Sequence, residues 1–154
     1  FDWEAMVRAI PILAEMDGCL QEPEHHGEGD VAIHTRMVVT EMLNLPEFET
    51  LTEEQRSILF AAAVLHDIAK PLTKKYIDGQ GWTFHGHEVV GGRMVPKIFN
   101  QLKLPLGEPV RFVRKMVELH LRPISLSKEE ITDSAIRRLL FDAGDDLESL
   151  MILC

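Results

Sequence analysis

The chain has 154 residues, of which 45% are hydrophobic and 27% charged, a composition typical of a soluble globular domain and not of a disordered, collagenous or coiled-coil protein. Its longest apolar run, residues 58–65, is far shorter than the ~20 residues that span a bilayer. Sixteen basic and twenty-five acidic residues give a net charge of −9, which argues against a basic surface for duplex DNA or for anionic lipid. The chain begins with no leader-like segment, and its two cysteines form no CxxC pair. We therefore expect a cytoplasmic protein whose residues 1–154 form a single domain, excised from a longer chain.

The N-terminal third predicts helices and a polar loop. Residues 6–16 have helical spacing, and Pro11 is expected to kink this helix. A polar loop follows over 21–29, after which Asp30 fits an N-cap for a helix that runs to about Asn44. The residues expected on the buried face of this helix are Val31, Val38, Met42 and Leu45.

A capping box marks the next helix, because Thr52 is followed three residues later by Gln55. We expect this helix to continue to Ala69 or Lys70, where Pro71 ends it.

The rest of the chain also predicts helices. Residues 72–84 are expected to form a loop, and a helix begins near His87. No stretch alternates with period two for long enough to predict a sheet, so the predicted fold class is all-α. Three further helices are expected, one beginning near Pro109, one over 132–144 and one over 147–153.

The residues with the clearest chemical meaning are His66 and Asp67, which end the apolar helix on its inward side. A buried aspartate is costly unless it is paired or bound to a cation. Neighbours in a helix lie about 100° apart around its axis, so both side chains can converge on one metal ion. Lys70 lies one turn later on the same face, and a lysine beside a metal site favours an anionic substrate. The alternative is a buried His–Asp pair with Lys70 on the surface.

Three more histidines strengthen the metal interpretation. His34, His87 and His120 are each expected on the inner face of a different helix, and Gly91, one turn after His87, permits close helix packing there. Each alone would be an ordinary core histidine, but together with His66 and Asp67 they favour a site for one or two divalent ions. Imidazole with carboxylate favours manganese, iron, nickel or zinc over calcium, with magnesium left open.

The order of these residues resembles the HD superfamily of metal-dependent phosphohydrolases. The segments 26–35, 66–71 and 84–88 are similar to the HD domain that accompanies bacterial CCA-adding tRNA nucleotidyltransferases and poly(A)-polymerase-like proteins. The resemblance runs from about Gln21 to Leu140 and excludes a nucleotidyltransferase head, so polymerisation is not expected. It implies a bundle of about six to seven helices with the metal site between helices.

The resemblance also implies roles for individual residues. It assigns the first metal to His34, His66 and Asp67, and a second metal to His87 and His120, with Asp67 bridging the two. It implies that Asp67 and Lys70 are the catalytic residues and that Lys70 contacts the substrate phosphate. The family closes its first-metal shell with a later aspartate, which we expect to follow Cys154. Further substrate contacts are expected from His85 and Arg122.

These features predict a phosphomonoesterase or phosphodiesterase that acts on a small phosphorylated substrate, either a nucleotide or an RNA end, including cyclic phosphates. Water on a divalent ion has its pKa lowered towards about 7, which provides a hydroxide nucleophile at neutral pH. Two alternatives stay open: a non-catalytic nucleotide- or RNA-binding module of a larger protein, and an HD-type di-iron oxygenase. The oligomeric state is not predicted.

Overall fold

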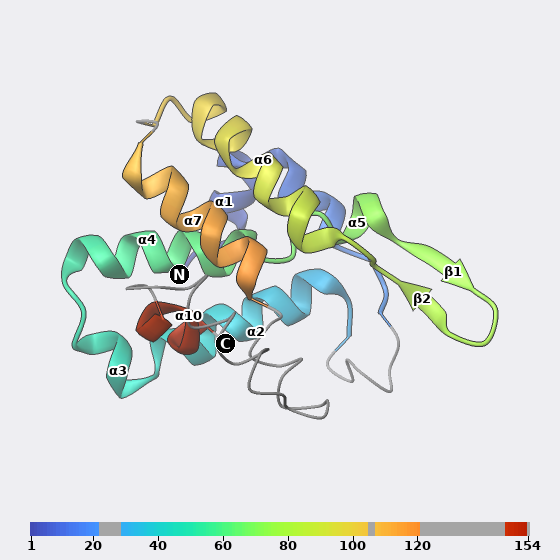
Figure 1. The fold of residues 1–154 in the computed structure, drawn as a ribbon, viewed down its shortest axis with the longest axis horizontal. Coiled ribbons are helices and arrows are strands. Elements are labelled where there is room, and N and C mark those ends of the chain that lie inside the picture. The colour runs from blue at the N-terminus through green and yellow to red at the C-terminus, as the bar shows by residue number, and fades with distance from the viewer. Residues whose placement is uncertain (22–28, 105–106, 121–146, 154) are drawn as a thin grey trace, which may run out of the picture.

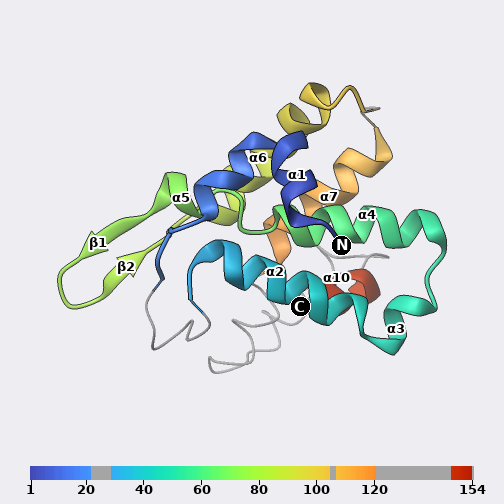
Figure 2. The same cartoon turned by 180° about the vertical axis from the view of Figure 1, so that it is seen from behind.

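The computed structural model describes residues 1–21, 29–104, 107–120 and 147–153. Figures 1 and 2 show an assembly of helices from which one small hairpin projects, so the predicted all-α class is confirmed. Among the described residues, no helix has the length and hydropathy of a bilayer-spanning segment. Arg122 and the helix expected over 132–144 lie outside the described residues, as does most of the expected loop over 21–29.

The N-terminal segment forms two short helices where the sequence predicted one kinked helix. α1 (Trp3–Ala9) begins at Asp2, whose side chain accepts a hydrogen bond from the backbone N–H of Ala5. A 3-10 helix, η1 (Pro11–Met16), follows at once. Because proline has no backbone N–H and its ring crowds the preceding turn, Pro11 separates the two elements completely.

α2 (Val31–Leu43) begins as predicted at Asp30, whose carboxylate accepts hydrogen bonds from the backbone of both Ile33 and Gly18 at 2.8 Å. The predicted buried face was partly wrong. Val38 is only half-buried. Leu45 is 36% exposed, because it lies beyond the end of α2, just before the short helix α3 (Pro46–Glu49). The buried residues of α2 are Val31, Ala32, Thr35, Val39 and Met42.

α4 (Glu53–Leu65) begins with the predicted capping box but ends earlier than predicted. Proline at position 71 cannot donate, and its ring would collide with the carbonyl of Asp67 in a continuing α-helix. The chain instead turns, with the backbone N–H of Lys70 bonded to the Asp67 carbonyl, and resumes as α5 (Lys70–Thr73). The helix therefore stops at the two residues of greatest chemical interest.

The segment predicted as a loop over 72–84 contains a β-hairpin, so the prediction that the chain forms no sheet was wrong for this segment. β1 (Lys75–Ile77) pairs antiparallel with β2 (Gly81–Thr83), and Tyr76 lies opposite Trp82. Strands of three residues are too short to produce a recognisable alternation in the sequence.

The remaining described helices are α6 (His87–Gln101), α7 (Glu108–Leu119) and α10 (Leu147–Leu153). α6 and α7 pack side by side in both views, while α4 contacts α2, α7 and α10 (Figures 1 and 2). A Cβ atom on Gly91 would lie 3.0 Å from Val117 Cγ1, so this glycine allows the close approach of α6 to α7, as expected.

Candidate metal centre

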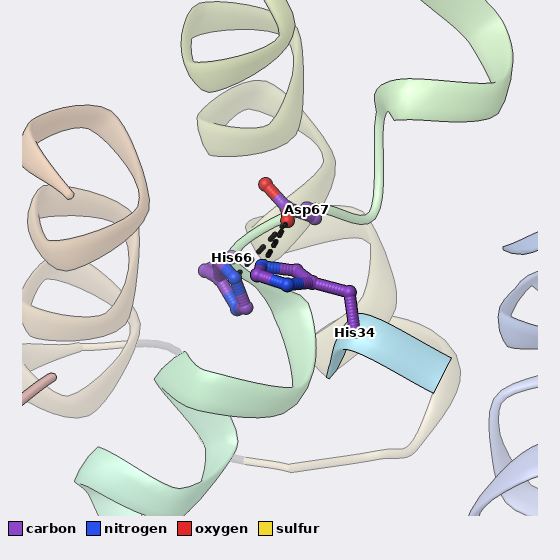
Figure 3. A group of neighbouring side chains, drawn as sticks. All are labelled: His34, His66 and Asp67. Carbon is purple, nitrogen blue, oxygen red and sulfur yellow. Dashed lines mark ion pairs between the residues drawn. The ribbon is translucent and has the colours of Figure 1, made fainter. Parts of the chain in front are cut away.

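The candidate site is built around the carboxylate of Asp67, which is 2% exposed. Asp67 Oδ2 lies 3.1 Å from Nε2 of His66 and 3.5 Å from Nε2 of His34. Figure 3 shows His34 reaching from α2 toward Asp67, beside His66 at the end of α4. The other oxygen, Oδ1, lies 3.1 Å from Nε2 of His87 and 3.3 Å from Nε2 of His120. Each carboxylate oxygen therefore faces its own pair of imidazoles.

Helix ends place most of these side chains. His66 follows the last residue of α4, His120 follows the last residue of α7, and His87 is the first residue of α6. His34 lies in the first turn of α2. The structure thus brings together, from α2, the end of α4, the start of α6 and the end of α7, all five residues that the sequence singled out as metal ligands.

Three imidazoles are oriented in the same way. In His66, His87 and His120, Nδ1 lies within hydrogen-bond distance of the backbone carbonyl three residues earlier. Because a carbonyl can only accept, Nδ1 carries the proton, and in the neutral ring Nε2 then presents a lone pair toward Asp67. A hydrogen bond from the distal ring nitrogen is the usual support of a metal-binding histidine. The acceptors are the carbonyls of Ala63, Phe84 and Val117.

The site also controls the protonation of its members. Burial by itself raises the pKa of Asp67, but the charge on His66 and contacts with the surrounding imidazoles outweigh burial and hold this pKa well below its ordinary value. Burial lowers the pKa of His66, but Asp67 outweighs this effect and the pKa is raised. Burial lowers the pKa of His120 below its ordinary value. The ionised carboxylate of Asp67 thus faces at least one imidazole, that of His120, whose neutral form is favoured by burial.

These donors fit divalent metal ions. Two groups, His34–His66–Asp67 and Asp67–His87–His120, each have their donor atoms within 4.8 Å of one another. In the described part of the chain, the buried Nε2 of His87 makes no hydrogen bond of good geometry, although Asp67 Oδ1 is 3.1 Å away. Two facing lone pairs in a buried site require a proton or a cation between them. Four imidazoles with one carboxylate are the donor set of borderline transition metals.

Lys70 is part of this site and is buried, so the alternative that placed it on the surface was wrong. Its Nζ lies 3.4 Å from Asp67 Oδ2 and 5.2 Å from the centre of the Phe84 ring. The same ammonium donates a hydrogen bond to Oε1 of Gln21. The contact of Lys70 with a substrate phosphate stays a prediction.

The sequence missed Gln21 and Phe84 as members of the site. Gln21 is 5% exposed and holds Lys70 from 49 positions away in the chain, in a segment that was expected to be a polar loop. No spacing rule connects a loop glutamine with a lysine so distant. Phe84 lies in the segment 84–88, one of those on which the family resemblance rests. Its position there was the sequence feature that could have identified it as a member of the site.

Of the two other expected substrate contacts, the structure describes only His85. His85 is exposed, in the turn before α6, and makes no contact with Asp67 within hydrogen-bond distance. Arg122 lies outside the described residues. Their roles stay predictions.

Comparison with known proteins identifies the family to which the chain belongs. The family model for the HD domain matches residues 31–148, a range that includes all four histidines of the cluster and Asp67. The chain therefore belongs to the HD domain family, and the resemblance seen in its sequence is confirmed.

The curated relatives are named as multifunctional CCA proteins and as an A-adding tRNA nucleotidyltransferase. The A-adding tRNA nucleotidyltransferase of Deinococcus radiodurans is 32% identical over 147 residues, which are 93% of this chain and 31% of the relative. The multifunctional CCA protein of Shewanella frigidimarina is 29% identical over 143 residues, 92% of this chain and 31% of the relative. That of Actinobacillus pleuropneumoniae is 31% identical over 100 residues, 65% of this chain and 23% of the relative. The chain thus spans about a quarter to a third of the length of these relatives.

Proposed function

We propose that this chain is a metal-dependent phosphohydrolase that acts on phosphate esters of nucleotides or of RNA ends, cyclic phosphates included. One observation carries the proposal: Asp67 presents Oδ2 to one pair of histidines and Oδ1 to another. A carboxylate divided in this way suits two divalent ions bridged by one residue. Paired ions at a short separation are typical of enzymes that cleave phosphate esters.

In this proposal His34 and His66 hold one ion, His87 and His120 hold the other, and Asp67 contacts both. When bound, such ions would supply Lewis acidity toward phosphoryl oxygens and would make water more acidic. The protein residues prepare the site for this chemistry. Hydrogen bonds at Nδ1 orient three of the rings, and burial of Asp67 strengthens every electrostatic interaction inside the site.

Lys70 is proposed to contact the phosphate of the substrate. Its ammonium lies beside Asp67 and is held by Gln21, so a positive charge is already positioned next to the ligands. In-line displacement at phosphorus places negative charge on the equatorial oxygens, and a fixed ammonium stabilises such charge without reorganisation.

The choice of substrate class follows from the relatives. One relative is named as an A-adding tRNA nucleotidyltransferase and another as a multifunctional CCA protein, and each aligns with more than nine-tenths of this chain. An RNA end or a nucleotide is therefore proposed as the substrate, and residues 1–154 are proposed to act as one domain.

The test is an activity panel on purified protein supplied separately with Mn²⁺, Ni²⁺, Zn²⁺, Fe²⁺ and Mg²⁺. The substrates are p-nitrophenyl phosphate, its bis ester, 3′-nucleotides, and 2′,3′-cyclic nucleotides, with products separated by chromatography. Metal-dependent turnover that Asp67→Asn removes supports the proposal. The absence of turnover on every substrate, with His66 and Asp67 intact and metal bound, contradicts it.

A further inference from the structure

The β-hairpin and the residue before it carry a group of aromatic and basic side chains, here called the hairpin patch: the half-buried Lys74 and the exposed Tyr76 and Trp82. Tyr76 is 61% exposed and Trp82 is 41% exposed. Their rings form a cross-strand pair with centres 5.4 Å apart, and Lys74 Nζ lies 4.3 Å from the centre of the Trp82 ring. Side chains alternate along a strand, so Lys74 and Tyr76 lie on the same face, while the exposed Lys75 lies on the other.

A structural role explains only part of this combination. A cross-strand aromatic pair stabilises a hairpin, but here much of the ring surface still faces water. Two lysines precede Tyr76 and one carboxylate, Asp78, lies in the turn, so residues 74–83 have a net charge of +1 in a chain whose net charge is −9. Exposed aromatic rings with adjacent ammonium groups are how proteins bind unpaired nucleotides, the rings stacking on bases and the cations meeting phosphates.

The base of the hairpin lies next to the candidate metal centre. Figure 1 shows it projecting away from the helices, between α5 and α6. At its base, the Phe84 ring lies under the Lys70 ammonium, and the Phe84 carbonyl is 3.0 Å from Nδ1 of His87. Trp82 precedes His87 by five residues, which bounds their backbone separation at about 18 Å. A short single strand can therefore reach both places at once.

We propose that the hairpin patch binds single-stranded RNA by stacking a nucleobase on the Tyr76–Trp82 pair, while Lys74, on the same face, contacts a phosphate of the strand. That the end of this strand reaches the metal centre rests on the function proposed above. The stacking itself does not, because it depends on the hairpin alone. Stacking tolerates any base, so the patch selects unpaired strands over duplexes and not one sequence over another.

The experiment measures fluorescence anisotropy of a fluorescein-labelled single-stranded RNA hexamer with the full chain in EDTA, where no turnover interferes. Trp82→Ala and Tyr76→Ala each weaken binding about 5- to 150-fold, the range that loss of one base–aromatic stack produces. Trp82→Phe retains most of the affinity, because an aromatic face is kept. Lys74→Gln reduces the slope of log affinity against log salt by about 0.7, whereas Lys75→Gln, on the other face of the hairpin, leaves this slope nearly unchanged. The matched control is Phe1→Ala, which removes an aromatic side chain that is 54% exposed and packs on Phe60, away from the hairpin.

Each outcome decides the proposal. Equal affinity of the wild-type chain, Trp82→Ala and Tyr76→Ala for the hexamer overturns it, as does equal affinity for the hexamer and a blunt RNA duplex. A concentration-dependent dimer that Trp82→Ala dissociates, without RNA binding, would assign the patch to a second copy of the chain instead. Binding that needs Tyr76 and Trp82 in a protein without phosphohydrolase activity supports the hairpin patch and contradicts only the proposed function.

Discussion

Oδ1 of Asp67 lies 3.1 Å from Nε2 of His87, a residue twenty positions further along the chain and at the start of a different helix. On the other side of the same carboxylate, Oδ2 faces His34 and His66. This division makes the two halves of the site separable by mutation, since only Asp67 belongs to both.

The first prediction concerns the number of metal ions. In protein loaded with excess Mn²⁺ or Ni²⁺ and then desalted, His34→Ala and His87→Ala each lose about half of the bound metal, whereas Asp67→Ala loses nearly all of it. The reason is that each histidine serves one group of ligands and Asp67 serves both. Inductively coupled plasma mass spectrometry measures the content. Equal, complete loss in all three variants would show a single ion in place of two.

A second prediction separates ligand histidines from other histidines. His66→Ala loses metal affinity by more than the 10- to 100-fold that follows removal of an outer-shell partner, because it removes a donor atom itself. His25, which lies outside the described residues, is not one of the predicted ligands, and His25→Ala retains wild-type affinity. Isothermal titration calorimetry gives both values. Equal affinities would remove His66 from the ligand set.

Metal removal is predicted to destabilise the fold. An ion that binds only the folded chain raises the free energy of unfolding by about 2.7 kcal/mol at a free concentration of about 100 Kd. For a domain of this size the corresponding increase in Tm is about 5–11 °C. Differential scanning calorimetry with metal and with EDTA measures this difference. The Asp67→Ala variant is the control and has the same Tm in both conditions; a metal-dependent shift that persists in this variant would place the ion elsewhere.

Lys70 is predicted to act on the substrate and not on the metal. Lys70→Met keeps the length of the buried side chain but removes its charge, so kcat/KM falls about 10²- to 10³-fold, as for loss of one preorganised donor. Metal content is unchanged. Gln21→Leu releases the Lys70 ammonium from one partner and gives a smaller loss of activity. Lys97→Met on the exposed side of α6 is the matched control. Loss of metal in Lys70→Met would assign this residue a structural role instead.

The packing of α6 on α7 gives a prediction for stability. Any Cβ on Gly91 would lie 3.0 Å from Val117, and Gly91→Val adds still more volume, so the free energy of unfolding falls by about 1–3 kcal/mol through overpacking. His120 is displaced as well, because its Nδ1 is held by the Val117 carbonyl. At the next position, a Cβ on Gly92 would lie 2.6 Å from Glu118 Cγ, so Gly92→Ala shifts the half-exposed Glu118 side chain from its ion pair with Arg114 and costs less than Gly91→Val, because a surface side chain moves and the packed core does not. Urea unfolding measures both. Equal stability of the two variants would contradict the close contact at Gly91.

Much of the fold follows from local rules that act within a few residues. The side chain of Asp30 caps α2, and the pair Thr52 and Gln55 caps α4, because each bonds to backbone groups one turn away. The early end of α4 follows a local rule too, since the clash of Pro71 reaches back to the carbonyl of Asp67. The prediction extended the helix to Ala69 or Lys70 because it ended the helix immediately before the proline and not at the carbonyl four residues before it.

The amino-acid sequence alone determined the helical class and the principal helix starts, since periodicity and capping are local properties. Together with the family resemblance, it also singled out the five residues that the structure brings together. Only the tertiary structure decided which oxygen of Asp67 each histidine faces, and that Gln21 holds Lys70. It also decided that Tyr76 and Trp82 share one face of a hairpin. These relationships join residues far apart in the chain or in strands too short to show a pattern. They arise when helices and turns pack together, and packing depends on all the side chains at once.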